Sequence, residues 1–166
     1  MLRIVRTIKE LNFGQLMAVY EESNRENGAE FYPGLPEGLQ IANAEQDFYQ
    51  YLRECFFKTE GACYAIWEEN AYVSALRLEP YQDGLLLEAL ETAPDQRGRS
   101  YAGALIRAVL KLPEVQKVYA HVHKKNTPSI RTHESCGFRR ILEYAVYIDG
   151  SVKNNACTVC YEKTTQ

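Results

Sequence analysis

Three successive segments in the middle of the chain have the composition of β-strands, and only short turns separate them. They span residues 62–68, 71–78 and 85–92. The turns contain Glu69-Asn70 and Asp83-Gly84, and the second pair is a strong β-hairpin signal. Strands with connections this short pair with their neighbours in opposite directions. The chain must therefore fold around an antiparallel meander of three adjacent strands.

Before the meander, alternation of apolar and charged residues predicts a strand over residues 2–8. Apolar residues then recur at helical spacing over 13–23 and 43–57, and Asn12 can cap the first of these helices. The stretch between them, residues 24–38, is rich in Asn, Gly, Pro and Glu. Turn residues of this kind predict a long loop, and loops of this length are often functional.

After the meander, apolar residues recur at three-to-four spacing as far as Leu110 and predict a helix that ends before Pro113. The rest of the chain predicts a strand, a short helix and two strands, over residues 115–123, 128–136, 139–148 and 157–163. The order is β-α-α-β-β-β-α-β-α-β-β, in one domain over residues 1–166.

Composition excludes several classes of protein. The chain has 166 residues, of which 46% are apolar and 25% charged, as in an ordinary globular domain. The net charge of −3 argues against a nucleic-acid-binding protein, and no apolar run is long enough to span a membrane. We expect a cytoplasmic protein, because five cysteines is an odd number and no signal-peptide segment is visible.

Two of the cysteines form a C-x-x-C pair, Cys157 and Cys160, without a second pair at metal-binding spacing. The segment has the pattern of a strand, in which residues three apart point to opposite faces. Packing in a strand is therefore favoured over a zinc or redox site, and no metal is expected.

The charge is divided unevenly along the chain. Residues 1–94 carry 7 basic and 16 acidic side chains, a balance of −9, whereas residues 95–166 carry 12 basic and 6 acidic ones, a balance of +6. The first half would attract a cationic ligand and the second an anionic one. The alternative is that the basic residues of the second half are simply solvated.

The segment 93–105 lies between the end of a predicted strand and the start of a predicted helix. It contains the small residues Gly98, Ser100, Ala102 and Gly103, and arginines at 97 and 99. Small residues let a backbone approach a pyrophosphate, and a helix N-terminus supplies free N–H groups with a favourable dipole. The segment is a candidate phosphate cradle; the alternative is a polar connection in which Ser100 only caps the helix.

A second segment, residues 122–138, has Asn126 at a strand exit and Gly137-Phe138 after a short helix. Together, the two segments and the order of elements resemble the GNAT superfamily of N-acetyltransferases. Residues 97–102 (RGRSYA) are similar to its R/Q-x-x-G-x-G/A acyl-CoA signature, and residues 126–138 are similar to its second motif, N-x-x-A-x-x-x-Y-x-x-x-G-F. The resemblance implies a GNAT-like α/β (α+β) domain with a mixed, mostly antiparallel sheet of about seven strands and helices on both faces.

The resemblance implies that acetyl-CoA (coenzyme A) is the acyl donor. The residues expected to bind it are Thr92, Arg97, Gly98, Arg99, Ser100, Tyr101, Ala102 and Asn126, with Lys124 and Lys125 as further candidates for its phosphates. Two positions depart from the family pattern, because Ser100 replaces a glycine and His133 replaces a tyrosine. That tyrosine protonates the departing thiolate in relatives, and an imidazolium is a competent acid near neutral pH. The alternative is that His133 only packs or faces solvent.

The acceptor side needs a base for the amine and a donor for the carbonyl oxygen. The resemblance places the donor in the backbone at Glu91-Thr92, and Glu88, Glu91 and His121 are the candidate bases. In a regular strand Glu88 and Glu91 face opposite sides, so only one would face the substrate unless a bulge intervenes. Solvated carboxylates, and simple packing for His121, are the alternatives.

The expected function is transfer of an acetyl group to a primary amine of a small molecule or peptide, by direct transfer in a ternary complex. Phe31 and Tyr32 lie in the predicted loop 24–38. In relatives this region covers the acceptor site, so the two side chains are candidates to line that site; the alternative is that they only anchor the loop. A non-catalytic acyl-CoA-binding or sensing module is the alternative function. No nucleic-acid or membrane partner is expected, and the final strands of such folds can pair across a homodimer.

Overall fold

The computed structural model describes residues 1–164. Its strands are β1 (Leu2–Val5), β2 (Cys63–Glu68), β3 (Tyr72–Tyr81), β4 (Gly84–Thr92), β5 (Lys117–His123), β6 (Arg139–Leu142), β7 (Ala145–Val146), β8 (Val152–Lys153) and β9 (Ala156–Glu162). Its α-helices are α1 (Phe13–Val19), α2 (Glu21–Phe31), α3 (Glu37–Glu54), α4 (Tyr101–Leu110) and α5 (Thr127–Ser135). Short 3₁₀ helices lie at Ile8–Glu10, Phe56–Lys58 and Pro94–Gln96.

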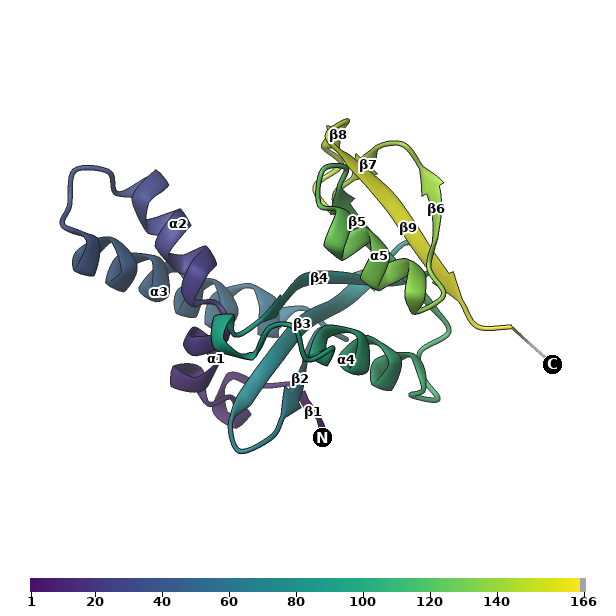
Figure 1. Cartoon of the computed structure of the whole chain (residues 1–166), viewed down its shortest axis with the longest axis horizontal. Coiled ribbons are helices and arrows are strands. Elements are labelled where there is room, and N and C mark those ends of the chain that lie inside the picture. Colours follow the sequence, from purple (N-terminus) through teal and green to yellow (C-terminus); the bar gives the residue numbers. More distant parts are fainter. Residues whose placement is uncertain (165–166) are drawn as a thin grey trace.

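Seven strands form the central sheet, in the order β1-β2-β3-β4-β5-β9-β6 (Figure 1). Every neighbouring pair is antiparallel except β4 and β5, which run parallel. The predicted meander is present as β2, β3 and β4, and the predicted mixed, mostly antiparallel sheet of about seven strands is confirmed.

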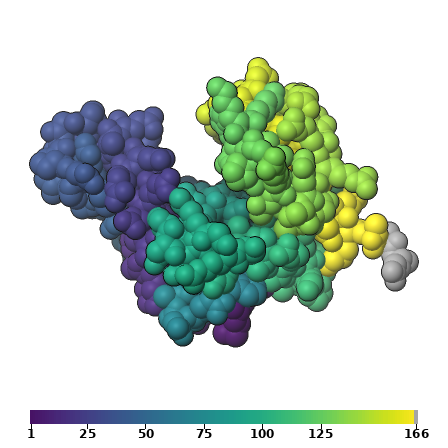
Figure 2. All heavy atoms as spheres, viewed as in Figure 1, coloured from purple at the N-terminus to yellow at the C-terminus, as the bar shows by residue number. Residues whose placement is uncertain are grey.

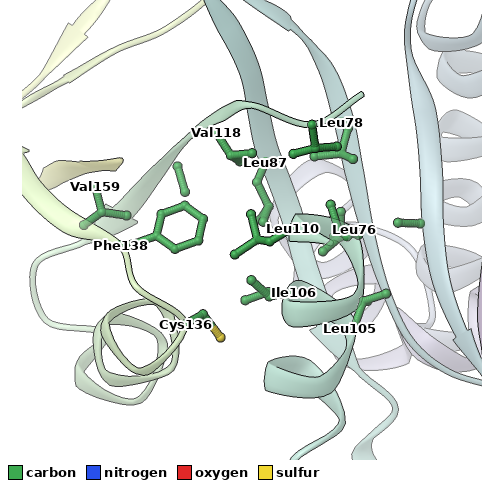
Figure 3. Packing of buried hydrophobic residues seen from close by; sticks show 14 of the residues in the cluster. Leu76, Leu78, Leu87, Leu105, Ile106, Leu110, Val118, Cys136, Phe138 and Val159 are labelled. Atoms are coloured by element: carbon green, nitrogen blue, oxygen red, sulfur yellow. The ribbon is translucent and has the colours of Figure 1, made fainter. Parts of the chain in front are cut away.

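Helices cover both faces of this sheet, as expected. One apolar cluster joins α4 to alternate residues of β2 and β3, such as Ala65 and Leu76, and extends to Phe138 after α5 (Figure 3). The other joins α1 and the end of α3 to the residues that point the opposite way, such as Tyr64 and Ile66. Strand β2 is buried on both faces over Cys63–Ile66, and its side chains are apolar at each of these positions.

The expected loop over residues 24–38 is wrong for most of its length. Residues 21–31 form α2 and α3 begins at Glu37, so that the connection between the two helices is only residues 32–36. The α2 helix has few apolar side chains, and its polar sequence gave no helical signal. It is held by close packing on α3, since a Cβ atom at Gly28 would lie 2.5 Å from the carbonyl oxygen of Gln40.

Other predicted elements shift at their ends. The predicted strand over 2–8 ends at Val5; the predicted helix over 13–23 breaks at Tyr20, where α1 ends and α2 follows; and the predicted helix over 43–57 is the longer α3. The predicted strand over 139–148 divides into β6 and β7, because β7 leaves the main sheet and pairs with β8. Residues 1–164 therefore contain one more helix and two more strands than the predicted order.

Cys157 and Cys160 lie in β9 and face opposite sides of the sheet, as the strand pattern predicted. Cys157 belongs to the α4-side cluster, and Cys160 packs against Tyr81, Leu86 and Tyr119 on the other face. Within residues 1–164, no group of three or more His, Cys, Asp or Glu side chains is placed to hold a metal ion. In the same part of the chain, none of the helices is both long and apolar enough to cross a membrane. The pairing of the final strands across a homodimer stays a prediction.

The contact between α2 and α3 gives a first prediction. We expect Gly28→Ala to lower the free energy of unfolding by about 1–3 kcal/mol, because the added methyl group collides with backbone of α3. Gly38→Ala is the matched control within α3, where a Cβ meets nothing within 4 Å, and should instead gain about 0.5–1 kcal/mol. Urea denaturation of both variants measures the difference, and equal effects would contradict the described packing.

Candidate active site

A cleft opens where β4 and β5 stop pairing. The parallel ladder between these strands covers only Leu85–Leu87 on β4 and Val118–Ala120 on β5. Beyond it β4 continues to Thr92 and β5 to His123 without pairing to each other. The two strand ends therefore diverge, and they leave backbone groups that a ligand can reach.

A bulge in β4 lies at the start of this divergence. The register between β3 and β4 shifts between Ala75–Glu91 and Arg77–Glu88, and Ala89 has a left-handed backbone with φ of 50°. The Tyr20 hydroxyl donates to the carbonyl of Ala89 at 2.5 Å. Because of the extra residue, Glu88 and Glu91 point to the same face of the sheet. In a regular strand, without such a bulge, they would point to opposite faces.

The end of β4, the loop before α4, α4 itself and α5 line a cleft of about 700 Å³, which we call the cofactor cleft. It unites the two sequence segments, because its lining includes the predicted residues Thr92, Arg97, Gly98, Ser100, Tyr101, Ala102 and Asn126. The N-terminus of α4 also contributes free backbone N–H groups, which favour an anion. Arg99, Lys124 and Lys125 are exposed and are not part of this lining.

Ser100 immediately precedes α4 and has a left-handed backbone, with φ of 63° and ψ of 23°. Its side chain makes no capping hydrogen bond, so the interpretation of Ser100 as a simple helix cap is wrong. Left-handed backbone favours glycine, which explains why the signature has a glycine at this position. Ser100 adopts this backbone conformation although it carries a side chain.

Two arginines line the cofactor cleft, and one of them was missed by the sequence reasoning. Arg97 donates a hydrogen bond to the Glu22 carboxylate of α2 at 2.6 Å, so its positive charge is partly neutralised by this ion pair. Arg107, on α4, lies against Gly103, where a Cβ atom would be 3.1 Å from its Nη1. The signal in the sequence was the glycine one helical turn before the arginine, since its lack of a side chain leaves room for the guanidinium.

His133 is buried, with 2% of its surface exposed, and packs edge-on against Phe138. Its Nδ1 donates to the carbonyl of Ser129 at 2.8 Å, and its Nε2 is buried without a hydrogen-bond partner among the described residues. Burial lowers the pKa of the imidazole. The ring lines a small cavity of about 200 Å³ between β4 and β5, so the alternative that His133 faces solvent is wrong.

His121 lines the same small cavity. Its ring lies between those of Tyr81 and Tyr147, with centroid distances of 5.6 and 5.0 Å, and burial lowers its pKa. Tyr81 donates to the carbonyl of Val146 at 2.5 Å, so this aromatic group ties the β7–β8 hairpin to the sheet. His121 therefore packs between two tyrosine rings. Because it also lines the small cavity, it stays a candidate base.

Another cavity, of about 390 Å³, lies between α2, α3 and β4 on the other side of the bulge. We call it the aromatic cavity, because its lining includes Tyr20, Phe31, Tyr32, Phe48 and Tyr51. Figure 2 shows a hollow between the α2–α3 arm and the segments that follow β5, whereas the residues that line the aromatic cavity all lie between Tyr20 and Glu91. Phe31 and Tyr32, singled out from the sequence, both line this cavity.

Glu91 lines both the cofactor cleft and the aromatic cavity. Its pKa is raised, mainly by burial, with Ser23 and Arg97 acting in the opposite direction. Glu88 lies one residue before the bulge and lines the small cavity instead. Burial and the neighbouring Glu79 raise the pKa of Glu88 to about 7.

The sequence profile of the Acetyltransferase (GNAT) family matches residues 17–138, which is more than half of the chain. The chain belongs to the GNAT acetyltransferase family. The resemblance inferred from the two motifs is thereby confirmed, and the matched region contains the bulge, the loop before α4 and α5. A search of curated protein sequences found no match.

Solved structures of acetyltransferases share the fold over nearly the whole chain. The aminoglycoside acetyltransferase AAC(6')-Ib in complex with coenzyme A and kanamycin has a TM-score of 0.63 at 19% identity, covering 98% of this chain and 94% of its own. PaiA N-acetyltransferase from Thermoplasma acidophilum, in complex with coenzyme A, has 0.59 at 13%, covering 98% and 99%. A mutant of SpeG spermidine N-acetyltransferase from Vibrio cholerae has 0.58 at 16%, covering 98% and 92%.

The backbone at Ser100 gives a prediction for this site. Ser100→Gly should raise the unfolding free energy by about 1 kcal/mol, because an L-residue in this conformation costs roughly 1–2 kcal/mol and glycine's extra chain entropy offsets part of the gain. The corresponding rise in Tm is about 2–4 °C. Ser100→Ala keeps the Cβ atom and should give no rise. Calorimetry on both variants is the measurement, and a Tm that falls with glycine would contradict the left-handed backbone.

Proposed function

We propose that the protein is an acetyl-CoA-dependent N-acetyltransferase that transfers the acetyl group directly to a primary amine within a ternary complex. The observation that carries this proposal is the position of Glu91, which lines both the cofactor cleft and the aromatic cavity. A thioester in the first and an amine in the second would meet at the end of β4. Holding two reactants in contact is a large part of what such an enzyme must do.

The cofactor cleft suits coenzyme A by its shape and charge. The N-terminus of α4 and the loop from Arg97 to Ala102 would receive the pyrophosphate, with Arg107 as a further cation and Asn126 at the edge of α5. The pantetheine arm would then follow the space between β4 and β5. Backbone near Thr92 would polarise the thioester carbonyl as negative charge develops on its oxygen.

The transfer step uses Glu91 and His133 as base and acid. Glu91 takes a proton from the ammonium group, and the freed nitrogen lone pair forms a bond to the acetyl carbon. The carbon–sulfur bond breaks, its electron pair leaves on the coenzyme A sulfur, and the His133 imidazolium protonates the thiolate from Nε2. The proton lost by the new amide restores His133. His121 is the alternative base, acting from the small cavity.

The acceptor is a small-molecule amine in this proposal. The five aromatic side chains and the acidic residues Asp47 and Glu91 of the aromatic cavity suit an ammonium group on an apolar body. Structural neighbours named for amine acetylation, one of them with kanamycin bound and another named for spermidine, support an amine acceptor. All five cysteines are free thiols, which supports a reducing compartment such as the cytoplasm.

The first test is acetylation of an amine panel, followed by release of free coenzyme A. Glu91→Gln should lower kcat by roughly 10²–10⁴-fold while coenzyme A still binds, because the base is lost and the cleft is kept. Glu54→Gln, on the exposed end of α3, is the control and should leave kcat unchanged. Coenzyme A binding without thiol release from any amine would instead favour the alternative of an acyl-CoA-binding or sensing module.

The pH dependence of kcat tests the two proton-transfer residues. Activity should rise with pH as Glu91 loses its proton, above the usual carboxyl pKa of 4.5, and fall as the His133 imidazolium loses its proton, below the usual 6.5. Glu91→Gln should remove the acidic limb and His133→Gln the basic one. His133→Tyr should retain activity at higher pH, because a phenol keeps its proton there. If kcat is unchanged in His133→Ala and His133→Tyr, His133 is not the acid.

A further inference from the structure

Arg77 is the one cationic side chain that lines the aromatic cavity in the described part of the chain. It extends from the middle of β3, and its guanidinium lies over the rings of Phe48, Tyr51 and Phe56, with distances to the ring centroids of 5.9, 5.3 and 5.6 Å. Three aromatic contacts hold the planar group in one place. A fixed guanidinium at the wall of a cavity is a receptor for a carboxylate.

The charge of Arg77 is incompletely satisfied by the protein. Its side chain is 15% exposed, and its Nε is buried without a hydrogen-bond partner among the described residues. The Glu88 carboxylate is 3.6 Å from Nε, which is longer than a hydrogen bond. An arginine that served only to neutralise a buried carboxylate would typically form short, paired hydrogen bonds with it.

Glu88 also neutralises Arg77 only in part. Burial and the neighbouring Glu79 raise the pKa of Glu88, against the opposing effect of Arg77, so that this carboxyl keeps its proton to a higher pH than an exposed one. Leaving a charged donor unpaired in a buried place is costly, and a ligand carboxylate would remove that cost.

The same cavity offers a place for an ammonium group close to the arginine. Arg77 is directly opposite Glu88, the residue before the bulge, and Glu91 follows the bulge on the same face. The Tyr64 hydroxyl donates to that of Tyr20 at 3.1 Å, and Tyr20 in turn donates to the bulge carbonyl. Arg77 and Glu91 thus flank one short stretch of β4, with aromatic rings beside them.

From this geometry we infer that the acceptor is a small zwitterion, an amino acid with an apolar side chain, whose carboxylate is bound by Arg77 while its amine faces Glu91. The inference rests on the proposed acetyltransferase function and narrows its substrate class. A polyamine would bring a second ammonium group toward Arg77, and a peptide N-terminus has no carboxylate beside its amine. Both are therefore expected to be poorer acceptors.

The test compares matched acceptors with the wild-type protein and acetyl-CoA. L-Phenylalanine, L-leucine and L-methionine are each compared with the corresponding amide and decarboxylated amine, and 1,4-diaminobutane represents the polyamines. We expect kcat/KM for at least one amino acid to exceed that of its amide and its amine by about tenfold or more, the effect of a charge-assisted pair. Better turnover of the amides, amines or diamine would overturn the inference and leave the proposed function intact.

The outcome in which no compound is acetylated is distinct, since it would overturn the proposed function together with this inference. A binding readout separates the cases: 3-phenylpropanoate, which has the carboxylate but no amine, should protect the protein against thermal unfolding more than 3-phenylpropanamide does. Equal protection by the acid and the amide would argue against a carboxylate site at Arg77.

Variants of Arg77 locate the effect. Arg77→Gln should abolish the preference for the amino acid over its amide and its decarboxylated amine, and Arg77→Lys should restore only part of the preference because the planar fork is lost. Arg53→Gln removes an arginine that lies over the Tyr49 ring on exposed α3 and serves as the matched control. An unchanged preference in folded Arg77→Gln would overturn the inference, and the wild-type comparison decides if that variant does not fold.

Discussion

Strand β4 departs from regular geometry at Ala89, and residues at this bulge or next to it line both the cofactor cleft and the aromatic cavity. The left-handed Ala89 shifts the register between β3 and β4 and turns Glu91 toward the face of the sheet that α2 and α3 cover. Tyr20 holds the bulge in place by donating a hydrogen bond to the Ala89 carbonyl. Past the same point β4 no longer pairs with β5. One local distortion thus borders the cofactor cleft on one side and directs a carboxylate into the aromatic cavity on the other.

The electrostatics of the two cavities follow from the elements that build them. Sequence halves of opposite charge predicted an anion site in the second half, and the cofactor cleft does draw Arg97 and Arg107 from it. The separation is incomplete, however, because Glu22 of the acidic half pairs with Arg97 across the cleft. In the aromatic cavity the partly buried Arg77 lies among acidic residues, so the overall negative charge of the first half does not describe the ligand that this cavity suits.

Much of the fold could be predicted from the sequence, because turn signals and apolar periodicity act locally. The meander, α4 and the strand character of Cys157 and Cys160 depend on such signals, and so did the family resemblance. The α2 helix could not be predicted, because it is held by contact of Gly28 with α3 rather than by its own pattern. The positions of Arg77 and Arg107 at cavities depend on residues that are distant in sequence. The bulge at Ala89 could not be predicted either, because no glycine marks the left-handed position.

A crystal structure with coenzyme A bound is the most direct test of a cofactor site beside the bulge, since it locates both ends of the cofactor. We expect the pyrophosphate against the backbone of residues 98–103 and the sulfur between β4 and β5, beside Glu91 and the small cavity that His133 lines. Coenzyme A bound elsewhere, for example in the cavity of about 420 Å³ near Cys63 and Leu112, or a sulfur remote from Glu91, would contradict this site.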